Sequence, residues 1–240
     1  MADLVSYARE GRVARIAMDD GKVNVMSAAM LGALHAAFDR AAAEKAVVVL
    51  SGRPGVFSAG FDLKTLMGGT AGDFYAMLRL GAELALKVLA FGTPVMSVIE
   101  GHAYPMGAFL TLASDWRIGT AGDWRIGLNE VQIGIPAPRF AIEVARQRLA
   151  PAYLSRTTVT GEMFAPAEAL AAGFLDEVAQ PQELEAAVER ALSRLLSADA
   201  ESHRITKARL RGPAIAAIRA AIDEDITMTY ASEVCARRAA

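Results

Sequence analysis

Residues 94–119, PVMSVIEGHAYPMGAFLTLASDWRIG, pass from a buried strand through a glycine-flanked loop into a helix. The apolar run Val95–Ile99 has the length of a strand covered on both faces. The pattern from Met106 to Ser114 favours a helix, and Pro105 suits its first turn, where the missing N–H would have had no helical acceptor. An earlier run, AVVVLSG (46–52), repeats the order of strand and glycine. Strands that alternate with helices in this way predict an α/β core.

The chain before this stretch carries its own local signals. The segment LVSYAREGRVARIAMDD (4–20) has two strand-like runs around Glu10–Arg12, which predict a β-hairpin. Ser27 is expected to cap a helix, because apolar residues follow it at helical spacing. RPGVFSAGFDLKTL (53–66) reads as a glycine-rich loop that runs into a short helix, and another helix is expected from about Asp73 to Phe91.

The pentapeptide DWRIG occurs twice, beginning at Asp115 and at Asp123. The spacing is too short for a structural repeat of the solenoid kind. We therefore expect two adjacent short strands around Ala121–Gly122.

The C-terminal third is mainly helical in pattern. APAEALAAGFLDEV (165–178) predicts a helix that stops at Gly173 and leads into a short strand, and PQELEAAVERALSRLLSA (181–198) predicts a helix with proline at its start. The last forty residues show helical patterns that we expect to break at Gly212–Pro213. We divide the chain into a core of residues 1–185 and a C-terminal helical region of residues 186–240.

Composition narrows the class of protein. The 240 residues are 53% hydrophobic with a formal charge of −2, so no basic surface for nucleic acid or anionic membrane is indicated. The single cysteine, Cys235, excludes a disulfide within the chain and fits a reducing compartment. No segment is apolar enough to span a membrane, and the first residues lack the apolar run of a signal peptide. A cytoplasmic protein is expected.

Two glycine-flanked loops could form part of an active site. Phe61 follows Gly60 ahead of a short helix, and Met106 follows Pro105 with its N–H free at the positive end of a helix. Two such backbone donors that converge on one oxygen would form an oxyanion hole. Gly60 and Gly107 would let the carbonyl of a ligand approach the backbone.

Four motifs strengthen this interpretation: VFSAGFDLKTL (56–66), IEGHAYPMGAFLTLASDWRIG (99–119), IGLNEVQIGI (126–135) and TGEMFAPAEALAAGFLDEVA (160–179). In their order and spacing, the chain resembles the crotonase (enoyl-CoA hydratase/isomerase) superfamily over nearly its whole length. The resemblance implies a spiral of repeated ββα units, a C-terminal helical region used for trimerisation, and an acyl-CoA thioester as substrate. Coenzyme A is then part of the substrate, and no separate cofactor is expected.

The resemblance also assigns residues. It places the oxyanion donors on the N–H groups of Phe61 and Met106, and the adenine end of coenzyme A along Ser58 and Ala59. Lys64 could face the phosphates of coenzyme A or simply solvent.

One departure from the family pattern bears on the reaction. Hydratases of the family carry two glutamates, but Phe109 occupies the first of these positions and only the second is acidic, at Glu130. The motif GLNE (127–130) is similar to the corresponding motif of the Δ3,Δ2-enoyl-CoA isomerase branch. Moving a double bond needs one base that removes a proton and returns it, so Glu130 is the expected proton shuttle, with Phe109 as an apolar wall.

Alternatives stay open from sequence alone. A hydratase or a thioester hydrolase could use the same fold, with Glu130 orienting water, and a non-catalytic acyl-CoA-binding protein could have kept only the spiral. Asp62 is better explained as a helix cap and His102 as a structural hydrogen-bonding group. His35 and His203 have no acidic or cysteine partners at ligand spacing, so no metal site is expected.

The C-terminal helices carry several apolar residues that a terminal segment would not bury by itself: Leu192, Leu195, Leu196, Ile215, Ile218 and Ile222. With the resemblance, they predict a homotrimer or a dimer of trimers.

Overall fold

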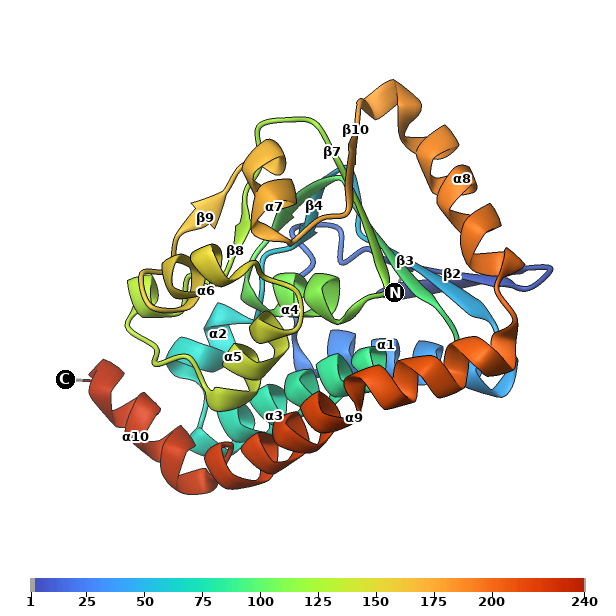
Figure 1. Cartoon of the computed structure of the whole chain (residues 1–240). Helices are drawn as coiled ribbons and strands as arrows, with labels where there is room; N and C mark the ends of the chain where they lie inside the picture. Colours follow the sequence, from blue (N-terminus) through green and yellow to red (C-terminus); the bar gives the residue numbers. More distant parts are fainter. Residues whose placement is uncertain (1–2, 240) are drawn as a thin grey trace.

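The computed structural model describes residues 3–239, in which two sheets are enclosed by helices (Figure 1). The six-stranded sheet has the order β1 (Val5–Glu10), β2 (Val13–Met18), β3 (Val47–Ser51), β5 (Val95–Ile99), β7 (Trp116–Thr120) and β10 (Glu177–Ala179). The four-stranded sheet has the order β4 (Gly55–Ser58), β6 (Gly101–Ala103), β8 (Ile126–Gly127) and β9 (Met163–Phe164). Neighbouring strands are parallel except for the pairs β1–β2 and β8–β9.

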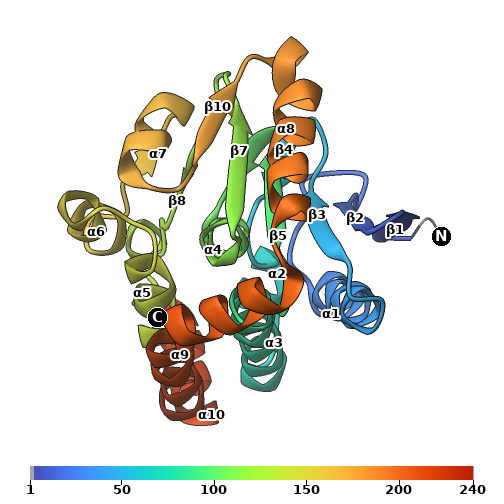
Figure 2. The ribbon, with the colours of Figure 1, turned by 45° about the vertical axis from the view of Figure 1, so that its right-hand side comes forward.

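The chain builds both sheets at once, as a spiral. Three successive pairs, β3 and β4, β5 and β6, β7 and β8, each place one strand in the larger sheet and the next in the smaller. Helices follow each pair: α2 (Leu63–Gly68) and α3 (Ala71–Leu89), then α4 (Pro105–Ala113), then η1 (Val131–Ile133) and α5 (Arg139–Arg146). Figure 2 shows the larger sheet with α4 and α3 below it. This arrangement confirms the predicted ββα spiral.

Several local predictions are confirmed. The hairpin β1–β2 turns at Gly11, which has a φ of 57°. α1 (Ala28–Ala43) begins after Ser27, whose side chain accepts a hydrogen bond from the N–H of Met30. Residues of β3 alternate between two apolar clusters, one on each face of the sheet, as expected for a covered strand.

Two predictions about strands were wrong. The stretch read as a loop from Arg53 contains β4, which pairs with β6 and so depends on a partner far along the chain. Both DWRIG copies form short strands, as predicted, but these strands are not neighbours in a sheet, since the first forms β7 of the larger sheet and the second leads into β8 of the smaller. The buried Trp124 side chain donates to the carbonyl of Thr120 at 3.0 Å and turns the chain between them.

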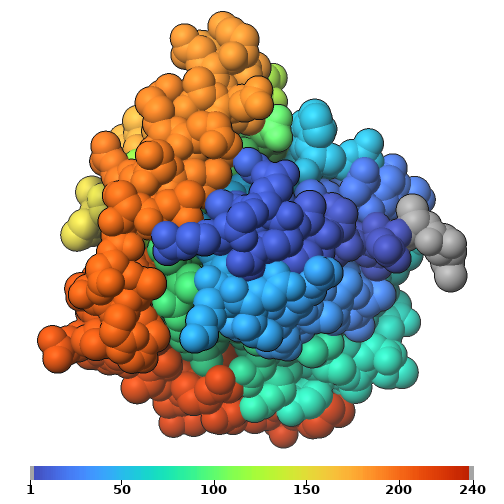
Figure 3. All heavy atoms as spheres, turned by 90° about the vertical axis from the view of Figure 1, so that its right-hand side faces the viewer, coloured from blue at the N-terminus to red at the C-terminus, as the bar shows by residue number. Residues whose placement is uncertain are grey.

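The remaining helices are α6 (Pro151–Thr158), α7 (Pro166–Ala172), η2 (Pro181–Glu183), α8 (Leu184–Ser197), α9 (Ala200–Asp225) and α10 (Met228–Ala239). α7 ends at Gly173 with a φ of 97°, as predicted. α8 covers the outer face of the larger sheet, beside the β1–β2 hairpin (Figure 3), where Arg15 forms an ion pair with Glu189 at 3.0 Å. Within residues 3–239, neither α9 nor any other helix combines the length and apolar character that crossing a membrane requires.

The predicted break at Gly212–Pro213 was wrong, because α9 runs through it as one helix of 26 residues. Proline inside a helix costs about 3 kcal/mol. Contacts on both sides offset that cost: Lys207 and Arg211 form buried ion pairs before Pro213, and Ile218 and Ile222 are fully buried after it.

The burial of α8 and α9 also changes the argument for oligomers. Leu192, Ile218 and Ile222 are buried within this chain, and Leu195, Leu196 and Ile215 are partly buried against it. These residues therefore do not by themselves require a second subunit. They show that the region after residue 185 shares its core with the region before it.

Asp115 is the anchor that holds α9 to the spiral. Its carboxylate forms ion pairs with Lys207 at 2.6 Å and Arg211 at 2.9 Å, and it accepts the N–H of Val95. Burial lowers the pKa of Lys207 to about 8 despite the carboxylate beside it. Arg211 also donates to the carbonyls of Leu89 and Ala113, the last residues of α3 and α4.

Asp115→Ala should therefore destabilise the protein by about 3–5 kcal/mol, because it leaves two buried cations without their carboxylate. The matched control is Asp123→Ala in the second DWRIG copy, where the side chain is 97% exposed and the expected change is within about 0.5 kcal/mol. Denaturant unfolding of both variants at pH 7 measures the difference. Equal stabilities would contradict the anchoring role of Asp115.

Candidate active site

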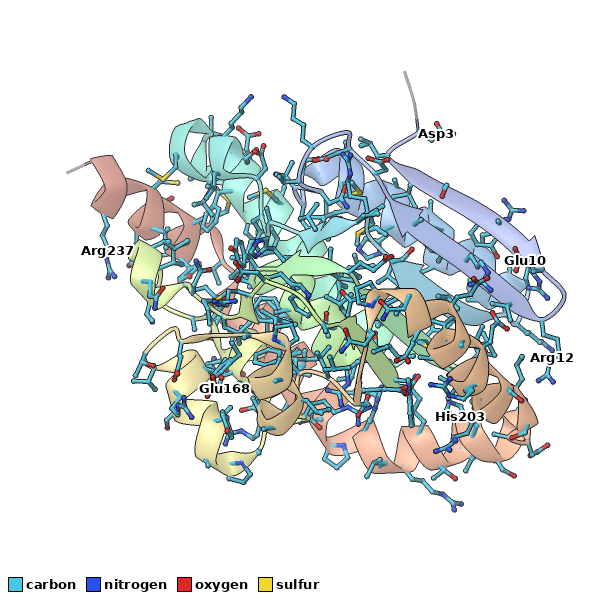
Figure 4. All side chains as sticks on the ribbon, turned by 90° about the horizontal axis from the view of Figure 1, so that it is seen from above. Asp3, Glu10, Arg12, Glu168, His203 and Arg237 are labelled. Atoms are coloured by element: carbon cyan, nitrogen blue, oxygen red, sulfur yellow. The ribbon has the colours of Figure 1, made fainter. Side chains whose placement is uncertain are left out.

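An apolar cavity of about 240 Å³ lies between α2, α3, α4, α5, α10 and the loop after β8. Its apolar wall includes Phe61, Leu66, Phe74, Leu78, Phe109, Ile135 and Phe140. Among the described residues that line it, Glu130 is the only one with a carboxyl group. Larger grooves of about 450 and 520 Å³ lie near Arg12 and His203, at the opposite end of the molecule from Arg237 of α10 (Figure 4). The walls of both include several charged side chains, among them Arg204 in the first and Arg148 in the second.

The two predicted oxyanion loops lie side by side. β4 and β6 are parallel neighbours, with Ser58 opposite Ala103, so both strands deliver their following loops to the same edge of the sheet. The N–H of Tyr104 donates to the carbonyl of Ser58 at 2.9 Å and joins the loops directly. Gly60 has a φ of 88°, which favours glycine, and Pro105 lies against it.

The two predicted donors differ in their access to the cavity: Phe61 lines it, whereas Met106 is fully buried and its neighbour Pro105 forms the lining. α4 begins with Pro105 after the N-cap Tyr104, so the N–H of Met106 belongs to the first turn and has no helical acceptor. Phe61 forms a parallel bridge with Met26, in which the N–H of Met26 donates to the carbonyl of Gly60 at 2.8 Å. In a parallel bridge of this kind the N–H of Phe61 points away from Met26 and takes no part in the bridge.

The predicted substrate-binding residues differ in their surroundings. Ser58 is fully buried, and its hydroxyl donates to the carbonyl of Asn24 and accepts the N–H of Gly60. This side chain shapes the loop from within, whereas Ala59 and Gly60 line the cavity. Gly107 packs closely against Ser58, and Lys64 is exposed on α2, outside the cavity lining.

The structural roles expected for Asp62 and His102 are confirmed. Asp62 caps α2 by accepting the N–H of Lys64 and the hydroxyl of Thr65. The Nδ1 of His102 lies 3.1 Å from the N–H of Arg125, which it accepts, and 3.2 Å from the hydroxyl of Tyr104.

Glu130 reaches the same cavity from the third strand pair. β8 is the parallel neighbour of β6, and Glu130 lies three residues after β8, at the start of the single turn η1. Its carbonyl accepts the N–H groups of Ile133 and Ile135, which fixes the loop around it. Glu130 is 8% exposed, and burial raises the pKa of its carboxyl to about 7, although a hydrogen bond from its own backbone N–H opposes the rise.

Phe109 occupies the neighbouring wall. It is 1% exposed on α4 and meets the ring of Phe140 edge-on, with 5.5 Å between centroids. Both rings line the cavity that holds Glu130. Their hydrocarbon surface supplies part of the desolvation that raises the pKa of the carboxyl.

Sequence reasoning missed three aromatic residues of the cavity: Phe74 of α3, Phe140 of α5 and Tyr230 of α10. The Tyr230 hydroxyl donates to the carbonyl of Pro136 at 3.2 Å, and its ring lies 6.4 Å from that of Phe74. Each residue comes from a helix whose apolar pattern predicts burial but not which cavity it joins.

A profile of the family described as "Enoyl-CoA hydratase/isomerase" matches residues 8–236, nearly the whole chain. The chain belongs to this family. Among curated relatives, it is 30% identical over 168 residues to "Enoyl-CoA delta isomerase 1, mitochondrial" of Homo sapiens. The alignment covers 70% of this chain and 56% of that relative, so the chain spans little more than half of the human protein's length.

Two solved structures from Mycobacterium tuberculosis are similar over most of their length. One, described as an enoyl-CoA isomerase, is 42% identical with a TM-score of 0.87, covering 93% of this chain and 97% of its own. The other, of the same protein but described as a probable enoyl-CoA hydratase, is 41% identical with a TM-score of 0.88, covering 92% of this chain and 94% of its own. The two descriptions differ in the reaction, so the names of relatives do not decide between isomerase and hydratase.

Burial of Glu130 should make stability depend on pH in a way that a single substitution removes. Between its ordinary pKa of 4.5 and the folded value of about 7, the folded protein holds a proton that the unfolded chain releases, so stability falls as pH rises through this window. The loss should be on the order of 3 kcal/mol.

Glu130→Gln cannot ionise and should be more stable than the parent at pH 8 but by a much smaller margin at pH 4.5. Denaturant unfolding of both proteins at the two pH values gives this margin. The other titrating groups contribute equally to parent and variant, so their contributions cancel in the margin. A margin that does not change with pH would show that the carboxyl is not buried in an apolar environment.

Proposed function

We propose that this chain moves the double bond of a 3-enoyl-CoA thioester to the 2-position, with Glu130 as the proton shuttle. The observation that carries the proposal is one buried carboxyl in an apolar cavity, beside two loops that offer free backbone N–H groups. A single group that takes a proton and returns it elsewhere suits isomerisation.

The proposed steps need only the carboxyl of Glu130 and the two backbone N–H groups of the neighbouring loops. The carboxylate of Glu130 removes a proton from C2, and the C–H electron pair moves into a dienolate whose charge rests largely on the thioester oxygen. The N–H groups of Phe61 and Met106 stabilise that charge. The protonated carboxyl then delivers a proton to C4, the double bond forms between C2 and C3, and Glu130 returns to the carboxylate.

The pKa of Glu130 suits both halves of this shuttle. A carboxyl with its ordinary pKa of 4.5 would be a weak base toward carbon, whereas a value of about 7 leaves it both partly ionised and basic near neutral pH. The apolar wall that includes Phe109 keeps water away from the dienolate and adds no second acid–base group. Both properties support isomerisation over addition of water.

The position of the reacting carbons also fixes where the rest of the substrate would lie. The acyl chain enters the apolar cavity, and coenzyme A extends from the thioester along the loop of Ala59 and Gly60, with the predicted adenine site beside Ser58. Lys64 on the exposed side of α2 is available to a phosphate group of coenzyme A.

A hydratase is the second candidate, because relatives of similar identity carry that name. It would convert a 2-enoyl-CoA into a 3-hydroxyacyl-CoA, with Glu130 orienting the water. Incubation with 3-enoyl-CoA and with 2-enoyl-CoA, followed by product identification, separates the two reactions.

Glu130→Gln should lower isomerase turnover by roughly a hundred to ten thousand times, the range for loss of a general base, while acyl-CoA binding survives. Exchange of the C2 hydrogen with deuterated water should disappear as well. Glu185→Gln, an exposed residue of α8, is the matched control and should keep full turnover. If the Glu130 variant isomerises as fast as the parent, the shuttle lies elsewhere. A parent chain that binds acyl-CoA without turnover or exchange would be a binding protein.

We further propose that the chain assembles as a homotrimer or a dimer of trimers. Support comes from exposed apolar side chains near the cavity, including Leu63 and Met67 of α2, Ile133 of η1 and Met228 of α10. Light scattering at micromolar concentration should give a mass of three or six chains of 25.4 kDa. A stable monomer would contradict the assembly but not the chemistry.

A further inference from the structure

The two proposed oxyanion donors belong to residues with large side chains, Phe61 and Met106, and both side chains lie against one glycine of α3. A Cβ added to Gly81 would lie 2.5 and 2.6 Å from Cε1 and Cζ of the Phe61 ring, and 3.0 Å from the Met106 sulfur. Real Cβ atoms essentially never lie closer than 3.0 Å to another heavy atom. Glycine is therefore the only residue type that fits at position 81 with the Phe61 and Met106 side chains in their present positions.

We propose that Gly81 is a positioning residue for the oxyanion hole, since its bare backbone seats both side chains and so holds the two donor N–H groups in register. This inference rests on the proposed function. It concerns how the hole is held in place, and Gly81 itself has no group that reacts.

At position 81, inside a helix, glycine lowers the stability of the protein unless it has a role of this kind. Glycine inside a helix is less stable than alanine by about 1 kcal/mol. Gly81 lies well inside the 19 residues of α3, is buried, and has a negative φ that alanine could adopt. The room it leaves for Phe61 and Met106 is the local feature that alanine could not reproduce.

Moving α3 to make room for an added methyl group would disturb the core, because Met77, Leu78 and Leu84 of this helix are buried in it. Arg79 pairs with Asp223 at 2.7 Å and Glu83 with Arg219 at 2.5 Å, which ties the helix to α9 on either side of Gly81. The strain would pass instead to the side chains opposite.

Those side chains have little freedom of their own. Met106 is fully buried, and the first turn of α4 cannot retreat, because Gly107 lies so close to Ser58 that an added Cβ there would meet the Ser58 Cβ at 2.9 Å. Phe61 is partly exposed and lines the cavity, so a ring displaced from Gly81 would take up space in the cavity. Either response shifts a donor or narrows the space for the carbonyl that it should meet.

The direct test is Gly81→Ala, with Gly32→Ala as control. Gly32 is also inside a helix, but an added Cβ there meets no atom within 4 Å. Removal of one oxyanion donor costs about 10²–10³ in turnover, so displacement by Gly81→Ala should lower kcat at least tenfold, with a smaller change in KM because the charge develops in the transition state. Gly32→Ala should keep the parent values.

Two further measurements separate positioning from general damage. The infrared carbonyl band of a bound saturated acyl-CoA should shift to lower frequency in the parent and return toward its free value in Gly81→Ala, while the circular dichroism spectrum stays the same. Phe61→Ala removes the ring, so adding Gly81→Ala in that background should cost much less than it does in the parent. This double variant also serves if Gly81→Ala alone folds poorly.

Gly81→Ala with parental kcat and an unchanged carbonyl band would overturn the inference, as would equal losses in the two backgrounds. Failure of the proposed function gives a different pattern: the parent has no turnover, yet its carbonyl band still shifts on binding and Gly81→Ala still abolishes the shift. That pattern would keep Gly81 as the residue that positions the carbonyl site.

Discussion

Parallel pairing of β4, β6 and β8 is the constraint on which the site depends. The register sets Ser58 opposite Ala103, and Ala103 opposite Ile126, so three strands end at one edge of a small sheet. The chain leaves that edge three times, and each of the three following loops carries one group of the proposed site: the N–H of Phe61, the N–H of Met106 and the carboxyl of Glu130. An antiparallel neighbour would send one of these loops to the opposite edge. The spiral therefore makes the site from short local segments, none of which needs to be long or unusual.

The cavity turns that placement into a chemical property. A carboxyl at the same edge but open to water would titrate near its ordinary pKa, and the rise to about 7 comes from burial. Burial of this carboxyl lowers the stability of the fold above neutral pH. The apolar packing of Phe109, Phe140 and the side chains of α3 in one buried cluster offsets that loss. Phe109 belongs to this hydrocarbon wall, at the position where the family resemblance would place the first glutamate of a hydratase. With phenylalanine there, Glu130 is the one carboxyl among the described residues that line the cavity.

Sequence predicts the parts of this protein that local chemistry decides. The hairpin at Gly11, the cap at Ser27, the helix start at Pro105 and the stop at Gly173 each follow from a residue's own backbone preference. The candidate site residues could be proposed because loops with glycines and a lone acid carry their signal in a few adjacent positions, together with the family resemblance. What could not be predicted depends on distant partners. β4 forms only because β6 lies beside it, α9 continues through Pro213 only because Asp115 and the core hold both of its halves, and Tyr230 joins the cavity only because α10 folds back onto α3.

The C-terminal helices consequently belong to the site as much as to any assembly. Tyr230 forms part of the cavity wall, while Arg211 and Arg148 donate to the carbonyls of Ala113 and Ser114, at the end of α4 opposite the Met106 donor. Cations at the carboxyl end of a helix stabilise it through its dipole. α4 is thus held at one end by α9 and presents its free N–H groups at the other. The proposed boundary at residue 185 lies within α8, and α9 beyond it supplies Lys207 and Arg211, which pair with Asp115, and one of the two arginines at the last turn of α4. The two regions are therefore joined by buried ion pairs as well as by a shared core.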